Sequence, residues 1–223
     1  MRKLSVLSII GLGLVVNAPA SSNSMVIVHT HSIMGSIPIK TWRSIRDERV
    51  VKQDLDYSCG AASIATILTE YYQRPTTEQE VLELLLKVNG QEIRASFDDM
   101  QVILPELGFR GVGLATGWEQ LTKLKIPVIL YVLQRKQDHF TVVSGIDEER
   151  VRLSDPSLGN RILTRGQFRQ IWETRLDEGL EGKLLAILPM DKNAYSEDRR
   201  FLKKPGVNRV STELLLLDRY LNP

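Results

Sequence analysis

Residues 127–146 read PVILYVLQRKQDHFTVVSGI, two apolar runs separated by a polar segment. Pro127–Leu133 is continuously apolar, which is typical of a buried strand, and Phe140–Ile146 has the same texture. The polar segment Asp147–Glu149 then leads into the alternating residues Arg150–Leu153, which predicts a third strand of a meander. Further strands are expected at Arg161–Leu163 and Lys183–Leu188.

The residues before this sheet predict helices. Ala61–Tyr72 carries apolar side chains at helical spacing. Thr76 or Thr77 begins a second helix, with Glu80 completing a capping box after Thr77, and that helix ends at Asn89-Gly90. Other helices are expected from Ser96 or Phe97 to Leu107, at Trp118–Leu124 and at Gln167–Thr174. Helices followed by an antiparallel meander indicate an α+β fold, with the N-terminal helices packed on the sheet.

The first twenty residues have the pattern of a secretory signal peptide. Met1-Arg2-Lys3 is basic, Leu4–Val16 is apolar, and Ala18-Pro19-Ala20 ends in small residues. The apolar run is shorter than the roughly 20 residues of a membrane-spanning helix, although an uncleaved anchor is the alternative. The sequence therefore predicts a periplasmic or secreted protein.

Four segments are expected along the chain. Residues 1–20 are the signal peptide, and 21–47 form an N-terminal arm with a strand near Met25–His29. Residues 48–190 form the folded domain. Residues 191–223 are a charged C-terminal tail that closes with a short amphipathic helix at Thr212–Leu221.

Charge and cysteine content exclude several classes of partner. The 223 residues include 29 Lys+Arg and 27 Asp+Glu. Because Arg2 and Lys3 are the charged residues among the first twenty, their removal leaves 27 of each sign. We expect neither a nucleic-acid partner nor membrane contact beyond the signal peptide. The 1 Cys forms no internal disulfide, and His29-Thr-His31 lacks a nearby third ligand, so we expect no metal and no cofactor.

Cys59, His139 and Asp155 are the candidate catalytic residues. A cysteine nucleophile needs a base, and the base needs an acceptor that orients it. Cys59 directly precedes a predicted helix, whose N-terminus stabilises a thiolate. In a hairpin that turns at Asp147, the residue numbers of facing positions sum to 294, so His139 faces Asp155. Taken singly, these residues are more often a buried apolar thiol, a structural histidine and a turn aspartate than catalytic groups.

Three segments together resemble the C39 family of cysteine peptidases. They are QDLDYSCGAAS at 53–63, DHFTVVSG at 138–145 and SDPSLG at 154–159, and the resemblance spans roughly residues 50–189. It implies a papain-like fold and four site residues. Cys59 corresponds to the nucleophile, His139 to the general base and acid, Asp155 to the residue that orients the imidazole, and Gln53 to the oxyanion donor. The chain departs from the family at Ala61, where many members have proline after Cys-Gly.

The sequence therefore predicts an exported cysteine endopeptidase that hydrolyses a peptide bond without metal or organic cofactor. Its substrate is a peptide or protein, with an exported precursor as one candidate. The alternative is a non-catalytic peptide-binding module of the same fold that assists an exported or surface-assembled partner. A transferase or amidase on this scaffold is a third interpretation. The sequence contains no phosphate-binding Gly-x4-Gly-Lys-Ser/Thr motif, and cleavage after a double glycine is not implied.

Overall fold

The structure is a computed structural model that describes residues 24–29, 34–89, 94–191 and 193–206. The chain divides into two compact units, Met1–Thr41 and Trp42–Pro223. The first unit contains an antiparallel hairpin of β1 (Ser24–His29) and β2 (Met34–Ile39), in which Val26 pairs with Ile37. The strand expected near Met25–His29 is thereby confirmed. The predicted signal peptide, His31 and the predicted helix at 212–221 lie outside the described residues.

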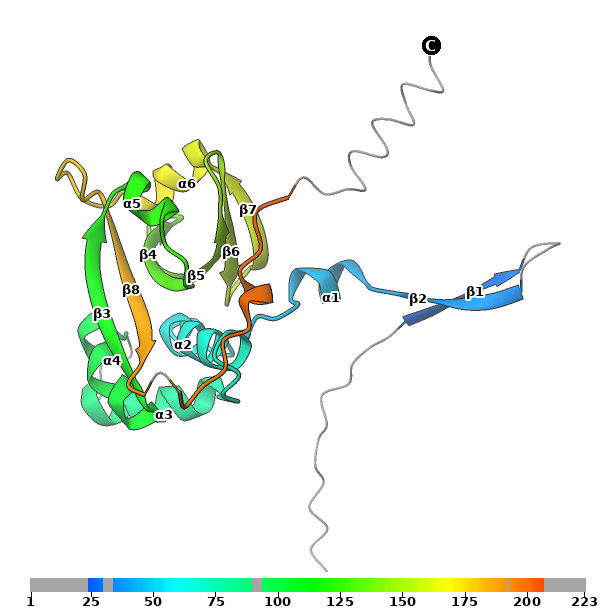
Figure 1. The fold of residues 1–223 in the computed structure, drawn as a ribbon, viewed down its shortest axis with the longest axis horizontal. Coiled ribbons are helices and arrows are strands. Elements are labelled where there is room, and N and C mark those ends of the chain that lie inside the picture. Colours follow the sequence, from blue (N-terminus) through cyan, green and yellow to red (C-terminus); the bar gives the residue numbers. More distant parts are fainter. Residues whose placement is uncertain (1–23, 30–33, 90–93, 192, 207–223) are drawn as a thin grey trace, which may run out of the picture. The chain divides into compact units, whose positions relative to one another are not determined.

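The second unit combines helices with an antiparallel sheet (Figure 1). The helices are α1 (Trp42–Arg46), α2 (Cys59–Glu70), α3 (Glu78–Asn89), α4 (Phe97–Ile103), α5 (Trp118–Thr122) and α6 (Arg165–Trp172), with short 3-10 turns η1 (Leu104–Leu107) and η2 (Arg199–Phe201). The strands are β3 (Phe109–Thr116), β4 (Val128–Gln134), β5 (Gln137–Ile146), β6 (Arg150–Asp155), β7 (Gly159–Thr164) and β8 (Gly182–Pro189). This arrangement confirms the predicted α+β fold.

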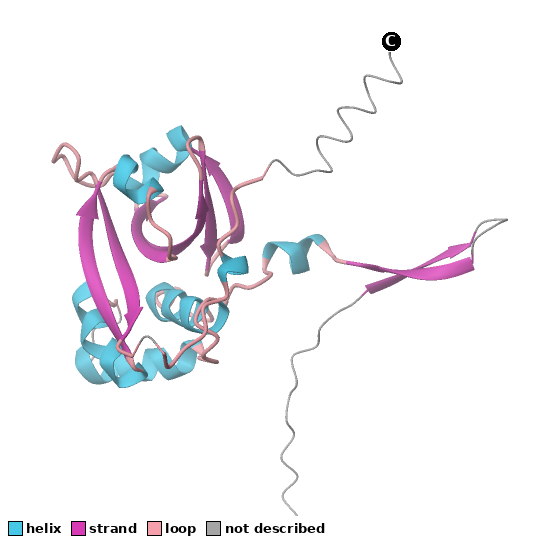
Figure 2. Ribbon diagram, in the orientation of Figure 1, coloured by secondary structure: helices cyan, strands magenta, loops and turns pink. Residues whose placement is uncertain are grey.

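The strands lie in the order β3-β8-β4-β5-β6-β7, and all neighbours are antiparallel. Strands β4 to β7 are the predicted meander, and Figure 2 shows how strongly they curl. The last strand, β8, inserts between β3 and β4. Strand β3 was not predicted, because most of its side chains are exposed or half-buried and its sequence therefore lacks an apolar period.

Apolar side chains cover both faces of the sheet. One core combines α2, α3 and α4 with Phe140, Val142 and Leu185. The other packs Phe168 and Trp172 of α6 against Val143 and Leu153. Helix α2 is buried without interruption from Cys59 to Leu68, so it lies inside the domain rather than on its surface. The core thereby holds the start of α2, where Cys59 lies, in a fixed position.

Local signals begin and end the helices much as the sequence predicts. The Thr77 hydroxyl accepts a hydrogen bond of 3.1 Å from the Glu80 N–H and starts α3. Ser96 and Asp99 form a reciprocal capping box at the start of α4. Gly108 ends η1 with a left-handed φ of 85°, a conformation that costs glycine little.

The β5–β6 pairing corrects the predicted register. Val143 pairs with Leu153, a sum of 296, and Gly145 pairs with Arg152, a sum of 297, with a bulge between Val143 and Gly145. The predicted sum of 294 is therefore wrong, and Asp155 does not lie directly opposite His139. Because the sum before the bulge differs by two residues, the two side chains still share one face of the sheet. They meet as diagonal neighbours.

The segment after β8 packs against the domain up to residue 206. The Tyr195 ring stacks on Phe109 with ring centroids 4.5 Å apart, and Phe201 is buried in the core. The Asp198 N–H donates to the Tyr71 carbonyl, and the Lys203 N–H donates to the Ser144 carbonyl at the β5 bulge. In the described ranges, no helix has both the length and the apolar content to cross a membrane.

Candidate active site

Three elements bring Cys59, His139 and Asp155 together. Cys59 is the first residue of α2, His139 lies near the start of β5, and Asp155 ends β6. The His139 Nε2 atom lies 3.1 Å from the Asp155 Oδ1 atom. The Cys59 side chain also interacts with the His139 imidazole and raises its pKa. Because Nε2 is engaged with Asp155, Nδ1 is the ring nitrogen that remains for the thiol.

The environment keeps His139 protonated at neutral pH. Burial by itself lowers the pKa of the imidazole, but the hydrogen bonds to Asp155 and Cys59 and the charges of these groups outweigh burial and raise that pKa to about 9. Burial raises the pKa of Asp155, whereas its bond to His139, the imidazolium charge, the Leu158 N–H and Arg161 lower it overall. Asp155 is thus a carboxylate that accepts a hydrogen bond from a cationic imidazole.

The turn after β6 explains the Asp-Pro-x-x-Gly pattern. The Asp155 Oδ1 atom accepts hydrogen bonds of 2.9 Å from the backbone N–H groups of Ser157 and Leu158. Gly159 has a φ of 79°, and a Cβ atom there would lie 2.7 Å from the Arg46 carbonyl oxygen. A larger residue at this position would therefore be strained twice, by its backbone and by its contact. The backbone of the turn itself therefore holds the Asp155 carboxylate in place.

The start of α2 leaves its first backbone N–H groups free of a side-chain cap. Ser58 is the N-cap residue, but its hydroxyl donates to the Leu55 carbonyl at 2.8 Å instead of accepting from the helix. The first N–H groups of a helix have no partner within the helix. They and the helix dipole stabilise negative charge beside Cys59.

Gln53 lies on a loop that is attached to the rest of the site through its backbone. The Gln53 N–H donates to the Pro156 carbonyl at 3.2 Å, and the Asp54 N–H donates to both carboxylate oxygens of the buried Glu78, at 3.0 and 3.1 Å. The Gln53 Nε2 atom donates to the Leu55 carbonyl at 2.9 Å. Its Oε1 atom is buried and has no hydrogen-bond partner within the described part of the chain.

Predicted site residues thus fall into two groups. Cys59, His139 and Asp155 interact with one another, whereas the Gln53 amide bonds the Leu55 carbonyl in the described structure rather than either Cys59 or His139. Since an amide nitrogen carries two hydrogens, one N–H of Gln53 remains for a further acceptor.

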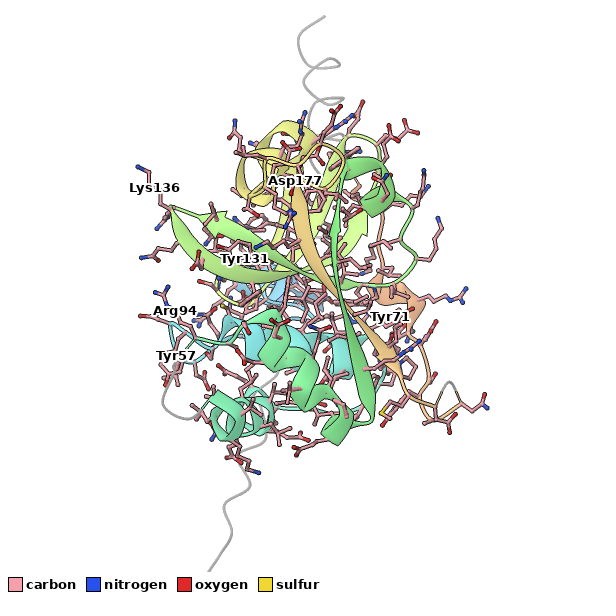
Figure 3. All side chains as sticks on the ribbon, turned by 90° about the vertical axis from the view of Figure 1, so that its left-hand side faces the viewer. Tyr57, Tyr71, Arg94, Tyr131, Lys136 and Asp177 are labelled. Carbon is pink, nitrogen blue, oxygen red and sulfur yellow. The ribbon has the colours of Figure 1, made fainter. Side chains whose placement is uncertain are left out.

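Aromatic and charged side chains lie on the side of the molecule where the β4–β5 hairpin projects. Figure 3 shows Tyr57, Arg94 and Tyr131 on this side, with Lys136 at the hairpin tip. The Tyr131 hydroxyl donates to Asp138 at 2.6 Å, and Arg94 forms an exposed ion pair with the same carboxylate at 3.8 Å. Asp138 directly precedes His139 on β5, and its side chain is exposed whereas the imidazole is buried.

Sequence reasoning missed two residues that contact the site. Arg161 donates to the Asp155 carboxylate, and Glu78 accepts from the loop that carries Gln53. Neither contact has a local sequence signal. Arg161 reaches Asp155 from the next strand, and Glu78 lies 24 residues from Asp54 on another helix. Across the described residues, no group of three or more His, Cys, Asp or Glu side chains is arranged to hold a metal.

Comparison with known proteins identifies the family. The family model described as "Peptidase C39 family" matches residues 47–176, which include Cys59, His139 and Asp155. This chain belongs to the peptidase C39 family. The expected family membership is therefore confirmed.

Two similar curated proteins are both named "Probable functional amyloid protease FapD". The one from Pseudomonas fluorescens is 35% identical over 145 residues, and the one from Pseudomonas aeruginosa is 34% identical over 145 residues. Each alignment covers 62% of this chain and 64% of the relative. The chain thus spans somewhat less than two thirds of the length of these relatives.

Solved structures share the fold. The double glycine motif protease from an AMS/PCAT transporter, solved with its leader peptide, aligns with a TM-score of 0.52 and 21% identity over 63% of this chain and 90% of that chain. The peptidase domain of Streptococcus ComA aligns with a TM-score of 0.52 and 20% identity over 63% of this chain and 97% of that domain. The predicted papain-like arrangement of a C39 peptidase domain is confirmed.

Proposed function

We propose that this protein is a cysteine endopeptidase that hydrolyses a peptide bond in an exported protein substrate. The observation that carries the proposal is the hydrogen bond between His139 and the buried Asp155, with Cys59 interacting with the same imidazole from the start of α2. A binding module gains nothing from a thiol at a helix N-terminus paired with a carboxylate-oriented imidazole. Peptide-bond cleavage uses each of these groups.

The mechanism follows from the charges at the site. The Cys59 thiolate attacks the substrate carbonyl carbon while the His139 imidazolium stays hydrogen-bonded to Asp155. The tetrahedral oxyanion accepts from the Cys59 backbone N–H and from the free N–H of Gln53. His139 then gives its proton to the leaving amine, and the acyl-enzyme forms. His139 next removes a proton from water, which restores the imidazolium while the hydroxide attacks the acyl carbon. The second tetrahedral intermediate then releases the carboxylic acid product and the Cys59 thiolate.

The export of the chain and the class of its substrate are part of the same proposal. The basic, apolar and small-residue pattern of residues 1–20 supports export to the periplasm or beyond. The relatives named functional amyloid proteases support a substrate that forms an amyloid. N-terminal sequencing of the protein from a periplasmic fraction should begin at Ser21. An N-terminus at Met1 would contradict the cleaved signal peptide.

Cleavage of exported proteins tests the enzymatic proposal. The purified chain should convert at least one protein of an exported-protein extract to shorter products, and Cys59→Ala should abolish the conversion while it still binds that protein. Ser63→Ala is the matched control, because Ser63 lies one helical turn further along α2, is buried and has no role in the mechanism. It should cleave at the wild-type rate. If cells that carry Cys59→Ala export and assemble the partner protein as wild-type cells do, the protein acts as a non-catalytic peptide-binding module.

Thiol labelling gives a second measurement that needs no substrate. Iodoacetamide should alkylate Cys59 rapidly near neutral pH, because the imidazolium stabilises the thiolate. His139→Ala should slow the reaction at least tenfold at the same pH. Mass spectrometry follows the alkylation. Equal alkylation rates for both proteins would contradict an activated nucleophile.

A further inference from the structure

The carboxylate that orients His139 is itself held by a cation from the neighbouring edge strand. The Arg161 Nη2 atom on β7 donates to the Asp155 Oδ2 atom at 2.9 Å, whereas the imidazole and the turn N–H groups bond Oδ1. We propose that Arg161 is a positioning residue of the active site: its guanidinium fixes the Asp155 carboxylate in the orientation in which that carboxylate bonds His139.

Burial makes this contact necessary. Asp155 is 0% exposed, and a buried carboxylate is stable as an anion only when its oxygens are hydrogen-bonded and its charge is balanced. Three donors bond Oδ1, so Oδ2 would be left unsatisfied without Arg161. A carboxylate held through one oxygen alone can rotate about its bond to Cβ, and rotation would move Oδ1 away from the imidazole.

The guanidinium is fixed in turn by the sheet. Arg161 pairs with Leu153 on β6, and this register places its side chain on the same face as Asp155, two residues further along β6. The same Nη2 atom also donates to the Gln134 Oε1 atom at 3.1 Å. Gln134 ends β4, the partner strand of β5, and so ties Arg161 to the hairpin that carries His139.

The charged groups around this pair come from three elements. Cys59 faces His139 from α2, and Arg161 faces Asp155 from β7. Lys52, on the loop before α2, interacts electrostatically with Asp155, but its Nζ atom donates to the Ser157 carbonyl at 2.7 Å and lies 3.8 Å from Asp47. Besides His139 itself, Arg161 is therefore the cation that bonds the Asp155 carboxylate directly among the described residues.

The inference rests on the proposed peptidase function, and one test of it requires turnover. Arg161→Gln should lower kcat roughly tenfold with KM nearly unchanged, since the substrate does not touch Arg161. Arg161→Lys should recover part of the loss because it restores the positive charge, and Arg161→Met should not. Loss of kcat with no recovery by lysine, and with Arg161→Lys folded as wild type, would overturn the proposal.

Arg150→Gln is the matched control. Arg150 has a similar side-chain exposure, 29% against 24% for Arg161, and forms an ion pair of 3.4 Å with Asp147, which does not bond the histidine. It should leave kcat within about twofold of wild type. Equal losses of kcat in the two variants would mean that any half-buried arginine of this sheet has the same effect, and the proposal would fail.

An NMR titration tests the same inference without any activity. In the full chain carrying Cys59→Ala, the His139 imidazole signal should titrate at lower pH when Arg161 is replaced by Gln, because a carboxylate that is free to rotate loses its hydrogen bond to the imidazolium. Arg150→Gln should leave the titration unchanged. An unchanged or higher pKa for Arg161→Gln would mean that Arg161 does not hold the carboxylate against the imidazole and would overturn its positioning role, even if cleavage by the wild-type protein is established. The expected pKa shift would support the positioning role of Arg161 even if no substrate is cleaved.

Discussion

The loop that carries Gln53 and the turn that carries Asp155 differ in how firmly they hold these two side chains. The 155–159 turn fixes Asp155 through both carboxylate oxygens, with donors from the turn itself, from β5 and from β7. The 51–58 loop is anchored through its backbone, whereas the Gln53 side chain makes one local hydrogen bond and leaves Oε1 buried without a partner in the described structure.

This difference separates two tasks. Orienting the imidazole requires a carboxylate that does not move, so its surroundings satisfy it completely. Binding an oxyanion requires a donor that gains its acceptor only when the tetrahedral intermediate forms. We therefore expect changes at Asp155 to affect both stability and activity, and changes at Gln53 to affect activity alone.

Among substitutions in these two loops, Asp155→Asn should have the largest effect. We expect kcat to fall by roughly three orders of magnitude and the free energy of unfolding near pH 7 to fall by about 3 kcal/mol, because Arg161 and the cationic His139 lose their shared anion. Peptide cleavage and urea denaturation measure the two effects. A variant with wild-type kcat would contradict the orienting role of Asp155.

The pH dependence of the same variant has a defined sign. In the wild type the pKa of His139 is raised to about 9, above its usual 6.5, so its contribution to stability is fully present below pH 6.5 and is lost as the pH rises through 9. The stability difference between wild type and Asp155→Asn should therefore shrink between pH 7 and pH 10. The wild-type kcat should also fall above about pH 9, as the imidazolium loses its proton, and this limb should move to lower pH in the variant.

Gln53→Ala should have a smaller effect, confined to catalysis. We expect kcat to fall about 10²-fold with the melting temperature nearly unchanged, because one oxyanion donor is lost and one local hydrogen bond is broken. Gln53→Glu is the control, since it keeps the size of the side chain but removes the donor at neutral pH. If Gln53→Glu cleaves at the wild-type rate, Gln53 does not bind the oxyanion.

Gly159→Ala should have the smallest effect and should act through the firm loop. We expect a loss of about 2 kcal/mol in the free energy of unfolding, measured by denaturation, from the left-handed backbone and the crowding against Arg46. Gly179→Ala isolates the backbone part, since Gly179 has a similar φ of 76° and no atom within 4 Å of its Cβ position. Equal losses at the two glycines would show that contact with Arg46 contributes nothing.

Sequence patterns were sufficient where a few neighbouring residues decide the outcome. The caps at Thr77 and Ser96, the apolar strand Val128–Gln134 and the position of Cys59 at the start of α2 depend on short-range periodicity and capping chemistry. The three motif segments likewise indicated the family from the sequence. These features could be predicted because each segment contains its own signal.

The sheet required the structure. The turn between β5 and β6 lies further along the chain than expected, and the bulge between Val143 and Gly145 then shifts the register by one, so Asp155 lies diagonal to His139. Strand β8 enters the sheet beside β4 although it is the last strand in the sequence. Strand β3 was hidden because its mostly accessible faces impose no apolar pattern. Register and strand order arise from contacts between distant residues, which local periodicity does not specify.

The sequence by itself determined a C39-type peptidase domain with a thiol at a helix N-terminus, a histidine on a strand and an aspartate in a glycine-ended turn. Only the tertiary structure brings these groups together and bonds His139 to Asp155. It also places Arg161 of the edge strand where its guanidinium bonds the second oxygen of Asp155. The physical reason is that burying a charge requires partners in space. The twist and register of a sheet choose those partners, whatever their separation along the chain.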